Sequence, residues 1–158
     1  YGPGDDFDLE TSHVLPALLR KAHEAKGAAP DGSDGPVTLW GSGEPKREFL
    51  YVEDLADAVR FLLETPEEEI REVAADGMLN VGVGDDLSIN ELMALIQEVV
   101  GHEGAVEHDR SKPDGTPRKL VDTSRMDALG WTADTSLREG IEKTYDWYRE
   151  HEEELIAA

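Results

Sequence analysis

Cysteine is absent from this chain of 158 residues, so neither a disulfide framework nor thiol chemistry is available within it. No apolar run approaches the roughly 18 residues that a membrane-spanning helix needs, and no signal-peptide pattern is present. We therefore expect no membrane partner, and the absence of cysteine fits a cytoplasmic location. The length predicts a domain with a substantial core.

Cations are scarce relative to carboxylates. Lys and Arg number 15 against 36 Asp and Glu, which gives a formal net charge of -21. Such an excess argues against nucleic acid or an anionic membrane as a partner. The carboxylates are scattered along the chain and do not form one acidic tail, which favours adaptation to high salt over a dedicated acidic interaction surface.

Several chemical motifs are also missing. Gly82-Val83-Gly84 lacks the third glycine of a dinucleotide-binding fingerprint and is interpreted as a turn. The histidines show no metal-ligand spacing, so no metal site is expected. No Gly-x-Ser-x-Gly motif of a serine hydrolase is present.

Hydrophobic periodicity predicts an α/β class with few short strands and several helices. Helices are expected over 14–25, 55–63, 89–100, 123–129 and 136–154, and strands over 37–40, 49–52, 78–82 and near 106. Ser12 is expected to cap the first helix, and Ser88 with Glu91 forms a capping box before the third. The second helix is expected to bury one face, formed by Leu55, Ala58, Val59, Leu62 and Leu63.

Residues 111–119 concentrate three cations, two prolines and a glycine in nine positions. The prolines restrict the loop, so it is predicted to hold Lys112, Arg118 and Lys119 toward an anion. The alternative is a solvated turn whose cations pair with some of the many carboxylates.

Other candidate residues stand at element ends. His13 opens the first helix, where the helix dipole favours a neutral imidazole that can act as an acid or a base. Trp40 ends a strand before the turn Gly41-Ser42-Gly43 and serves either as a stacking platform or as a core residue. Arg47 follows that turn and either binds an anion or pairs with a neighbouring Glu.

Four segments together resemble one enzyme family: residues 12–21, 40–43, 47–50 and 112–119. This pattern is similar to that of the GDP-L-fucose synthases. These are extended short-chain dehydrogenase/reductases, of the NAD-dependent epimerase/dehydratase type, that epimerise and then reduce GDP-4-keto-6-deoxymannose. The Trp-Gly-Ser-Gly turn is shared by many sugar-nucleotide enzymes. Ser-His-Val combined with Lys-Pro-Asp-Gly-Thr-Pro-Arg-Lys is more specific, and the resemblance covers nearly the whole chain.

The resemblance implies roles for individual residues. His13 matches a histidine implicated in proton transfer during epimerisation and lying near the cofactor. Tyr1 and Gly2 match a segment beside the nicotinamide end of NADP. The positions that match substrate-binding residues for the GDP-sugar are Lys21, Trp40, Arg47, Asp114 and Lys119. Lys21 stands where some relatives carry Arg, which keeps the charge and loses the bidentate fork.

The family's glycine-rich cofactor motif, its Ser-Tyr-Lys catalytic set and its reactive cysteine do not occur in this chain. The chain also opens on a turn without an initiator Met. Residues 1–158 are therefore expected to form a single sugar-nucleotide-binding domain, the C-terminal substrate-binding part of an extended Rossmann-type dehydrogenase/reductase, inactive alone. The intact enzyme is expected to use NADP, to be a homodimer, and to convert GDP-4-keto-6-deoxy-D-mannose to GDP-L-fucose. The alternatives are another nucleotide-sugar epimerase or dehydratase, or a non-catalytic module that binds a sugar nucleotide or a partner protein.

Overall fold

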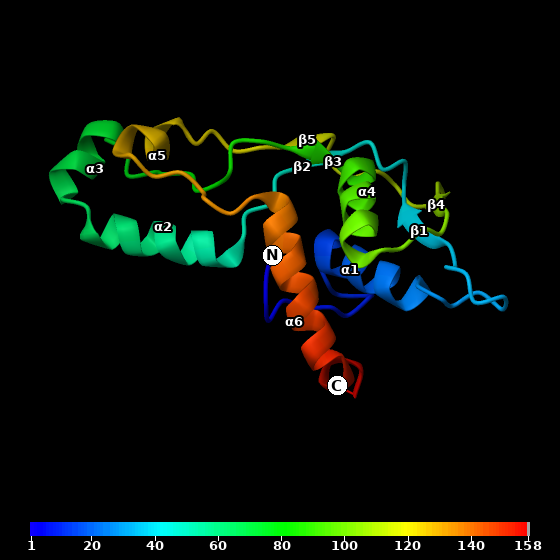
Figure 1. Ribbon diagram of the computed structural model, residues 1–158. Helices are drawn as coiled ribbons and strands as arrows, with labels where there is room; N and C mark the ends of the chain where they lie inside the picture. Colours follow the sequence, from blue (N-terminus) through cyan, green and yellow to red (C-terminus); the bar gives the residue numbers. More distant parts are fainter. Residues whose placement is uncertain (158) are drawn as a thin grey trace.

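The computed structural model describes residues 1–157 and alternates helices with short strands (Figure 1). The helices are α1 (Val14–Ala25), α2 (Val52–Glu64), α3 (Glu67–Val73), α4 (Ile89–Val100), α5 (Ser124–Leu129) and α6 (Leu137–Ala157). The strands are β1 (Val37–Trp40), β2 (Lys46–Arg47), β3 (Leu87–Ser88), β4 (Val106–Asp109) and β5 (Arg118–Lys119). The predicted α/β class with few short strands and several helices is confirmed.

Two small sheets are formed. Strands β1 and β4 pair in parallel, with Val37 opposite Val106 and Trp40 opposite Asp109. The second sheet has the order β3-β2-β5, in which β2 is antiparallel to β3 and parallel to β5. The strands are short, so the main effect of both sheets is to fix where the loops that follow them begin.

The larger hydrophobic core lies among α1, α4, α6 and β1, and we call this part of the molecule the body. Its fully buried side chains include Leu15, Leu19, Leu39, Leu92, Ile96, Ile141 and Tyr148. Helix α4 begins with the predicted capping box between Ser88 and Glu91, and it ends at Gly101, whose φ of 71° is left-handed. The inward face of α6 consists of Ile141, Tyr145 and Tyr148, which are buried.

Helices α2, α3 and α5 and the loops that connect them form an arm, which extends to the left of the body in Figure 1. Its core is a small cluster of buried residues: Ala58, Met126 and Trp131. Two carboxylates of α2 attach this helix to the loop after α5. Asp54 accepts hydrogen bonds from the backbone N–H and the hydroxyl of Thr135 (3.1 and 3.0 Å), and Asp57 accepts one from the indole N–H of Trp131 (3.0 Å).

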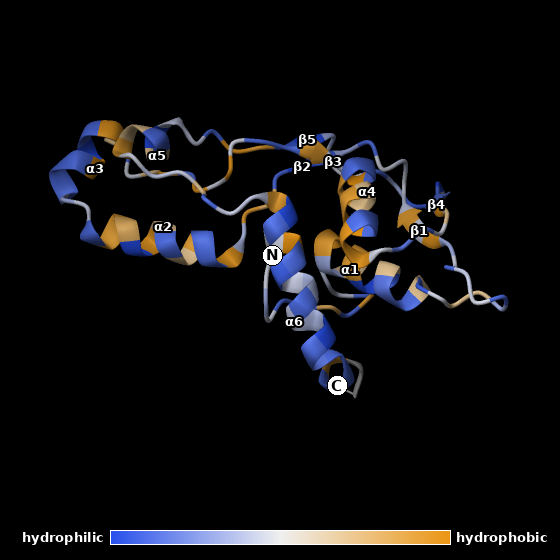
Figure 2. Cartoon of the chain, in the orientation of Figure 1, coloured by the Kyte–Doolittle hydropathy of each residue, from blue (hydrophilic) through white to orange (hydrophobic). Residues whose placement is uncertain are grey.

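The predicted buried face of α2 is wrong in part. Ala58 is buried, but Leu55, Val59 and Leu63 are 44, 50 and 82% exposed. The carboxylates of Asp54 and Asp57 are held by partners across the arm. These polar contacts orient α2 so that the side of the helix with Leu55, Val59 and Leu63 faces outward. Figure 2 shows apolar segments along α2 as well as along α1 and α4.

Three further local predictions fail. The strand near residue 49 lies earlier, at Lys46–Arg47, and Val52 already begins α2. Residues 78–82 form no strand among the described residues, and the Asn80 side chain instead donates to the carbonyl of Asp122 (3.1 Å). His13, not Ser12, is the N-cap of α1, and no side chain caps the helix. Pro16 occupies the third helical position and has no N–H for such a cap to bind.

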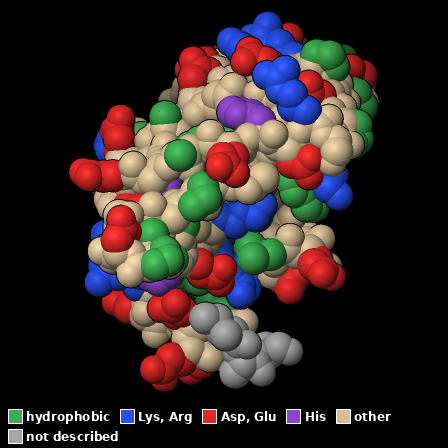
Figure 3. All heavy atoms as spheres, turned by 90° about the vertical axis from the view of Figure 1, so that its right-hand side faces the viewer, with side chains coloured by type: hydrophobic (Ala, Val, Ile, Leu, Met, Phe, Trp, Pro, Cys, Tyr) green, Lys and Arg blue, Asp and Glu red, His purple; other side chains and the backbone are tan. Residues whose placement is uncertain are grey.

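The surface reflects the acidic composition. Figure 3 shows carboxylates spread over the face that it presents, with no single acidic block. Helix α3, Glu67–Val73, has no buried residue. None of the described helices combines the length and the apolar character that crossing a membrane requires.

Candidate functional site

The turn that follows β1 is the structural centre of the site. Gly41 and Gly43 both have φ of 75°, a left-handed conformation that glycine adopts without strain. Between them, Ser42 donates its backbone N–H (2.8 Å) and its hydroxyl (2.7 Å) to the two carboxylate oxygens of Asp114. A Cβ on Gly41 would lie 2.3 Å from Asp114 Oδ1. The turn and the loop around Asp114 are therefore fastened together.

These bonds define what Asp114 does. The N–H and the hydroxyl of Ser42 hold the pKa of Asp114 below its usual range. Each of its oxygens accepts a hydrogen bond from Ser42, so the carboxylate fixes the turn. Asp114 also borders the pocket described below, and its predicted role in substrate binding stays a prediction.

Asn90, in the first turn of α4, fastens the same turn from the other side. Its amide Nδ2 donates to the carbonyl of Ser42 (3.3 Å) and to Glu44 Oε1 (3.2 Å), and its backbone N–H donates to Gly43 (3.0 Å). His108 Nε2 lies 2.9 Å from Asn90 Oδ1 and must donate, because a carbonyl oxygen only accepts. The sequence analysis missed Asn90, since no local pattern relates it to a turn 48 residues earlier.

Trp40 ends β1 with 59% of its surface exposed, so it is not a core residue. Lys21 Nζ lies 5.4 Å from the centre of the indole ring, and Lys112 Nζ lies 5.1 Å from it. Both distances are typical of cation–π contacts. Lys21 also donates to the carbonyl of Thr38 (3.3 Å), and burial lowers the pKa of its ammonium. The structure thus places an exposed aromatic ring beside two ammonium groups.

Arg47 is held by backbone carbonyls. Its Nη1 donates to the carbonyls of Lys46 (2.6 Å) and Thr116 (2.7 Å), and no described carboxylate forms an ion pair with it. The expected pairing with Glu44 or Glu48 is therefore not observed among the described residues. A guanidinium held through one nitrogen keeps its remaining N–H groups in a fixed direction.

Glu48 accepts hydrogen bonds from backbone amides and does not pair with Arg47. Its Oε1 accepts from the backbone N–H groups of Val83 (2.6 Å) and Gly84 (2.7 Å), and its Oε2 accepts from that of Val121 (3.1 Å). One carboxylate thus ties together three separate chain segments. The Gly82-Val83-Gly84 segment is a loop, as predicted, and two of its amides are already engaged.

The three cations of the 111–119 loop point to three different places. Arg118 forms an ion pair with Asp86 (2.5 Å), whereas Lys112 lies over Trp40. Lys119 is in register with Arg47 in the parallel pair β2–β5, so the two side chains leave the same face of the sheet. The prediction that all three cations face one anion is wrong, because neighbouring residues of a strand point to opposite faces.

Two neighbouring pockets use these residues. A pocket of about 270 Å³ is bordered by Lys21, Trp40, Arg47 and Asp114. A second pocket, of about 510 Å³, is bordered by Tyr1, His13, Arg47 and Lys119. Arg47 and Val14 border both pockets. The structure brings Trp40 and Arg47 together in one pocket and places Lys119 with His13 in the other.

His13 and the N-terminal residues lie at the wider pocket. His13 is exposed, and its backbone carbonyl accepts from Ala17 (3.1 Å). The amino group of Tyr1 donates to Leu50 (3.1 Å) and its carbonyl accepts from Val52 (2.9 Å). Burial, with Asp54 nearby, raises the pKa of the Tyr1 phenol. Gly2 is buried against Val52, whose Cγ1 would lie 2.4 Å from a Cβ at that position.

Charge pairing differs between this region and much of the molecule. Seven cations elsewhere have carboxylate partners within salt-bridge distance: Arg20, Arg60, Arg71, Arg125, Arg138, Lys143 and Arg149. Lys26, at the end of α1, instead donates to the carbonyl of Val100 (2.9 Å). No described carboxylate forms such a pair with Lys21, Arg47, Lys112 or Lys119. In a chain with 36 acidic residues, unpaired cations gathered around an exposed indole form a site suited to an anion that carries an aromatic or apolar group.

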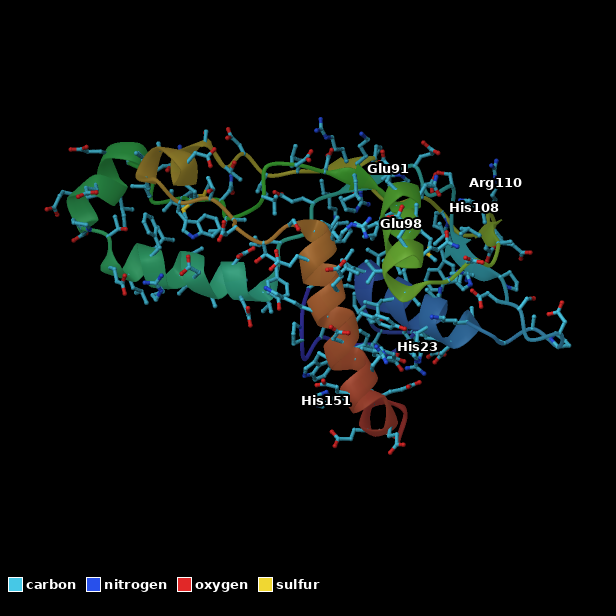
Figure 4. All side chains as sticks on the ribbon, viewed as in Figure 1. His23, Glu91, Glu98, His108, Arg110 and His151 are labelled. Atoms are coloured by element: carbon cyan, nitrogen blue, oxygen red, sulfur yellow. The ribbon has the colours of Figure 1, made fainter. Side chains whose placement is uncertain are left out.

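Metal binding has no support in this geometry. Within residues 1–157, no group of three or more potential ligands lies close enough to hold a metal ion. Figure 4 shows His108 and Arg110 beside β4, away from His23 and His151 on α1 and α6.

Comparisons with known proteins agree on one class. Residues 1–82 match the model described as "NAD dependent epimerase/dehydratase family". GDP-L-fucose synthase 1 of Arabidopsis thaliana is 51% identical over 148 residues, covering 94% of this chain and 42% of that protein. The chain therefore spans less than half the length of this relative.

Two solved structures resemble the fold closely. A GDP-6-OMe-4-keto-L-xylo-heptose reductase from C. jejuni superposes with a TM-score of 0.84 at 30% identity, over 96% of this chain and 51% of that one. A GDP-L-fucose synthetase from Naegleria fowleri bound to NADP gives 0.77 at 29% identity, over 97% and 45%. All three of these proteins are named for GDP-sugars.

Proposed function

Because this chain belongs to the NAD dependent epimerase/dehydratase family, we propose that it is the substrate-binding portion of an NADP-dependent GDP-L-fucose synthase. The reaction is the conversion of GDP-4-keto-6-deoxy-D-mannose to GDP-L-fucose by epimerisation at C3 and C5 and reduction at C4. The chain spans about half the length of its relatives or less, and we propose that residues 1–158 act as one sugar-nucleotide-binding unit within a longer protein.

The observation that carries the proposal is the group of unpaired cations beside an exposed indole. Lys21 and Arg47 border the same pocket as Trp40, and Arg47 also borders a second pocket. A nucleotide sugar has three chemically different parts in a row: an aromatic base, a diphosphate and a sugar. The two pockets offer matching surfaces: the indole of Trp40, the cations Lys21 and Arg47, and a second pocket bordered by His13 and Lys119.

We assign the parts of the substrate accordingly. The pocket at Trp40 takes the nucleoside, and Arg47, which borders both pockets, binds the diphosphate. The wider pocket takes the sugar between His13 and Lys119. There the imidazole of His13 exchanges the proton at C3 or C5, which requires only that it reach the ring face from its exposed place at the start of α1. Asp114 contributes by holding the turn that carries Ser42 next to Trp40.

The cofactor needs separate treatment. When bound, NADP supplies the hydride for reduction at C4. The amides of Val83 and Gly84 donate to Glu48 and do not cradle a phosphate. We assign Tyr1, Gly2 and His13 to the nicotinamide end of the cofactor, and Tyr1 and His13 border the wider pocket.

This assignment has consequences for the intact protein and its surroundings. We propose that the intact protein is a cytoplasmic homodimer and that this chain alone does not catalyse reduction. The excess of carboxylates is proposed to be an adaptation to high salt, in which screening relieves self-repulsion. A melting temperature that fails to rise between low and molar KCl would refute the salt adaptation.

Calorimetric titration of the chain with GDP, GDP-L-fucose and UDP tests the proposal. We expect GDP and GDP-L-fucose to bind, and Arg47→Gln to weaken both by about tenfold or more, the scale of a lost charged hydrogen bond. Arg149→Gln is the matched control, since Arg149 is exposed on α6 and lies 3.9 Å from Asp146. Equal binding of UDP would favour a different nucleotide-sugar enzyme. Absence of nucleotide binding would favour the non-catalytic alternative.

A further inference from the structure

Lys112 is held in place although its side chain has no polar partner of its own. Its backbone N–H donates to the carbonyl of Asp109 (3.2 Å), and Asp109 Oδ1 accepts from the backbone N–H (3.0 Å) and the hydroxyl (2.6 Å) of Ser111. Two residues later, Asp114 is fastened to Ser42. The loop is thus anchored on both sides of Lys112, which fixes where its side chain begins.

The ammonium of Lys112 lies 5.1 Å from the centre of the Trp40 ring, and no described carboxylate forms an ion pair with it. Lys143 provides the contrast within the same chain. It lies 5.4 Å from the centre of the Tyr51 ring, but it also pairs with Glu139 at 2.9 Å. Lys143 is therefore paired within its own helix. Lys112 lies near enough to Asp109 to help lower the pKa of that carboxyl, but it forms no ion pair within salt-bridge distance and stays beside an exposed aromatic ring.

The other cations of the loop cannot take this place. Arg118 is bound to Asp86, and Lys119 faces the wider pocket with His13. Lys112 and Lys21 are the two ammonium groups next to the indole. An anionic group that approached Trp40 would be attracted by both, and Lys interacts with phosphate as a compact point charge.

From this geometry we infer that Lys112 binds a phosphate group of the nucleotide directly, as a second ammonium beside Lys21 at the ring of Trp40. The inference rests on the proposed function, because it presupposes that a nucleotide occupies the pocket that Trp40, Pro113 and Asp114 border, next to Lys112. It assigns Lys112 to recognition of the phosphate charge, distinct from packing against the base. The contribution of Lys112 should therefore grow with the number of phosphates on the ligand.

The test compares GDP, GMP and guanosine as ligands of the full chain and of Lys112→Met, Lys112→Arg and Lys143→Met. We expect Lys112→Met to weaken GDP about tenfold or more, GMP less, and guanosine hardly at all. Lys112→Arg should restore most of the GDP affinity, since it restores the charge. The Lys143→Met control removes the same charge from a cation–aromatic contact elsewhere and should leave all three affinities unchanged.

The possible results separate the two claims. If the unsubstituted chain binds GDP and Lys112→Met binds it equally well, the inference is wrong while the proposed function stands. An equal loss for GDP and guanosine would also overturn it, because that result assigns Lys112 to packing on Trp40. If the unsubstituted chain fails to bind GDP at all, the proposed function fails and the inference fails with it.

Discussion

The body and the arm of this molecule are held together in different ways. In the body, α1, α4 and α6 enclose a continuous apolar core whose central side chains are fully buried. In the arm, three buried residues are supplemented by carboxylates of α2 that accept hydrogen bonds from the loop after α5. The comparison teaches that apolar side chains in a helix do not by themselves decide which face is buried, since α2 turns Leu63 outward.

The candidate site belongs to the body. The turn with Gly41 and Gly43 follows a strand of the body, and Asn90 on α4 and Asp114 on the facing loop fasten it. A rigid core beneath the turn keeps the indole of Trp40 and its neighbouring cations in a fixed arrangement. Preorganisation of this kind reduces the entropy lost on ligand binding.

The largest effect expected from the comparison concerns the two cores. Leu92 is fully buried in the body, whereas Leu63 in the arm is 82% exposed. Leu92→Ala should lower the free energy of unfolding by about 2–5 kcal/mol, because a buried methyl cluster is lost and a cavity remains. Leu63→Ala should change it by less than about 0.5 kcal/mol. Urea denaturation measures both.

A similar loss for the two variants would contradict the difference between body and arm. Equal slopes of unfolding free energy against urea are needed for the comparison, since a changed slope would indicate a changed unfolded state.

A smaller effect is expected from the polar attachment of the arm. Asp54→Ala removes the acceptor for two hydrogen bonds from Thr135, and we expect a loss of about 1–3 kcal/mol. The loss should appear as faster amide hydrogen exchange in α2 and at residue 135, with little change in α1 and α4. Glu53→Ala, at the exposed neighbouring position, is the control. Uniformly faster exchange through the body would show that the arm and the body unfold as one unit.

Sequence reasoning predicted the body better than the arm, for a physical reason. The helices predicted over 89–100 and 136–154 and the capping box at Ser88 rest on local signals, and the structure confirms a helix at both places and the capping box. The orientation of α2 depends on Asp54 meeting Thr135, a residue 81 positions away. No local pattern contains that information.

In the candidate site, too, local features were predictable from the sequence and long-range contacts were not. The types of residue at Trp40, Arg47 and Lys119 and their spacing from glycine turns made them candidates before their positions were known. Their grouping into two pockets, the pairing of Arg118 with Asp86 and the attachment of the turn by Asn90 all depend on long-range packing. The parallel register of β2 and β5, which puts Lys119 beside Arg47, was likewise not predictable from two-residue strands.

Amide hydrogen exchange of the chain with and without saturating GDP-L-fucose tests the central claim most directly. The account predicts slower exchange in residues 40–47 and 110–119, because the ligand covers the turn after β1 and the loop facing it. It predicts no change in the arm, over residues 53–73 and 124–129. Slower exchange confined to the arm would contradict the assignment of the nucleotide-sugar site to the body. Unchanged exchange throughout the chain at saturating GDP-L-fucose would contradict it as well.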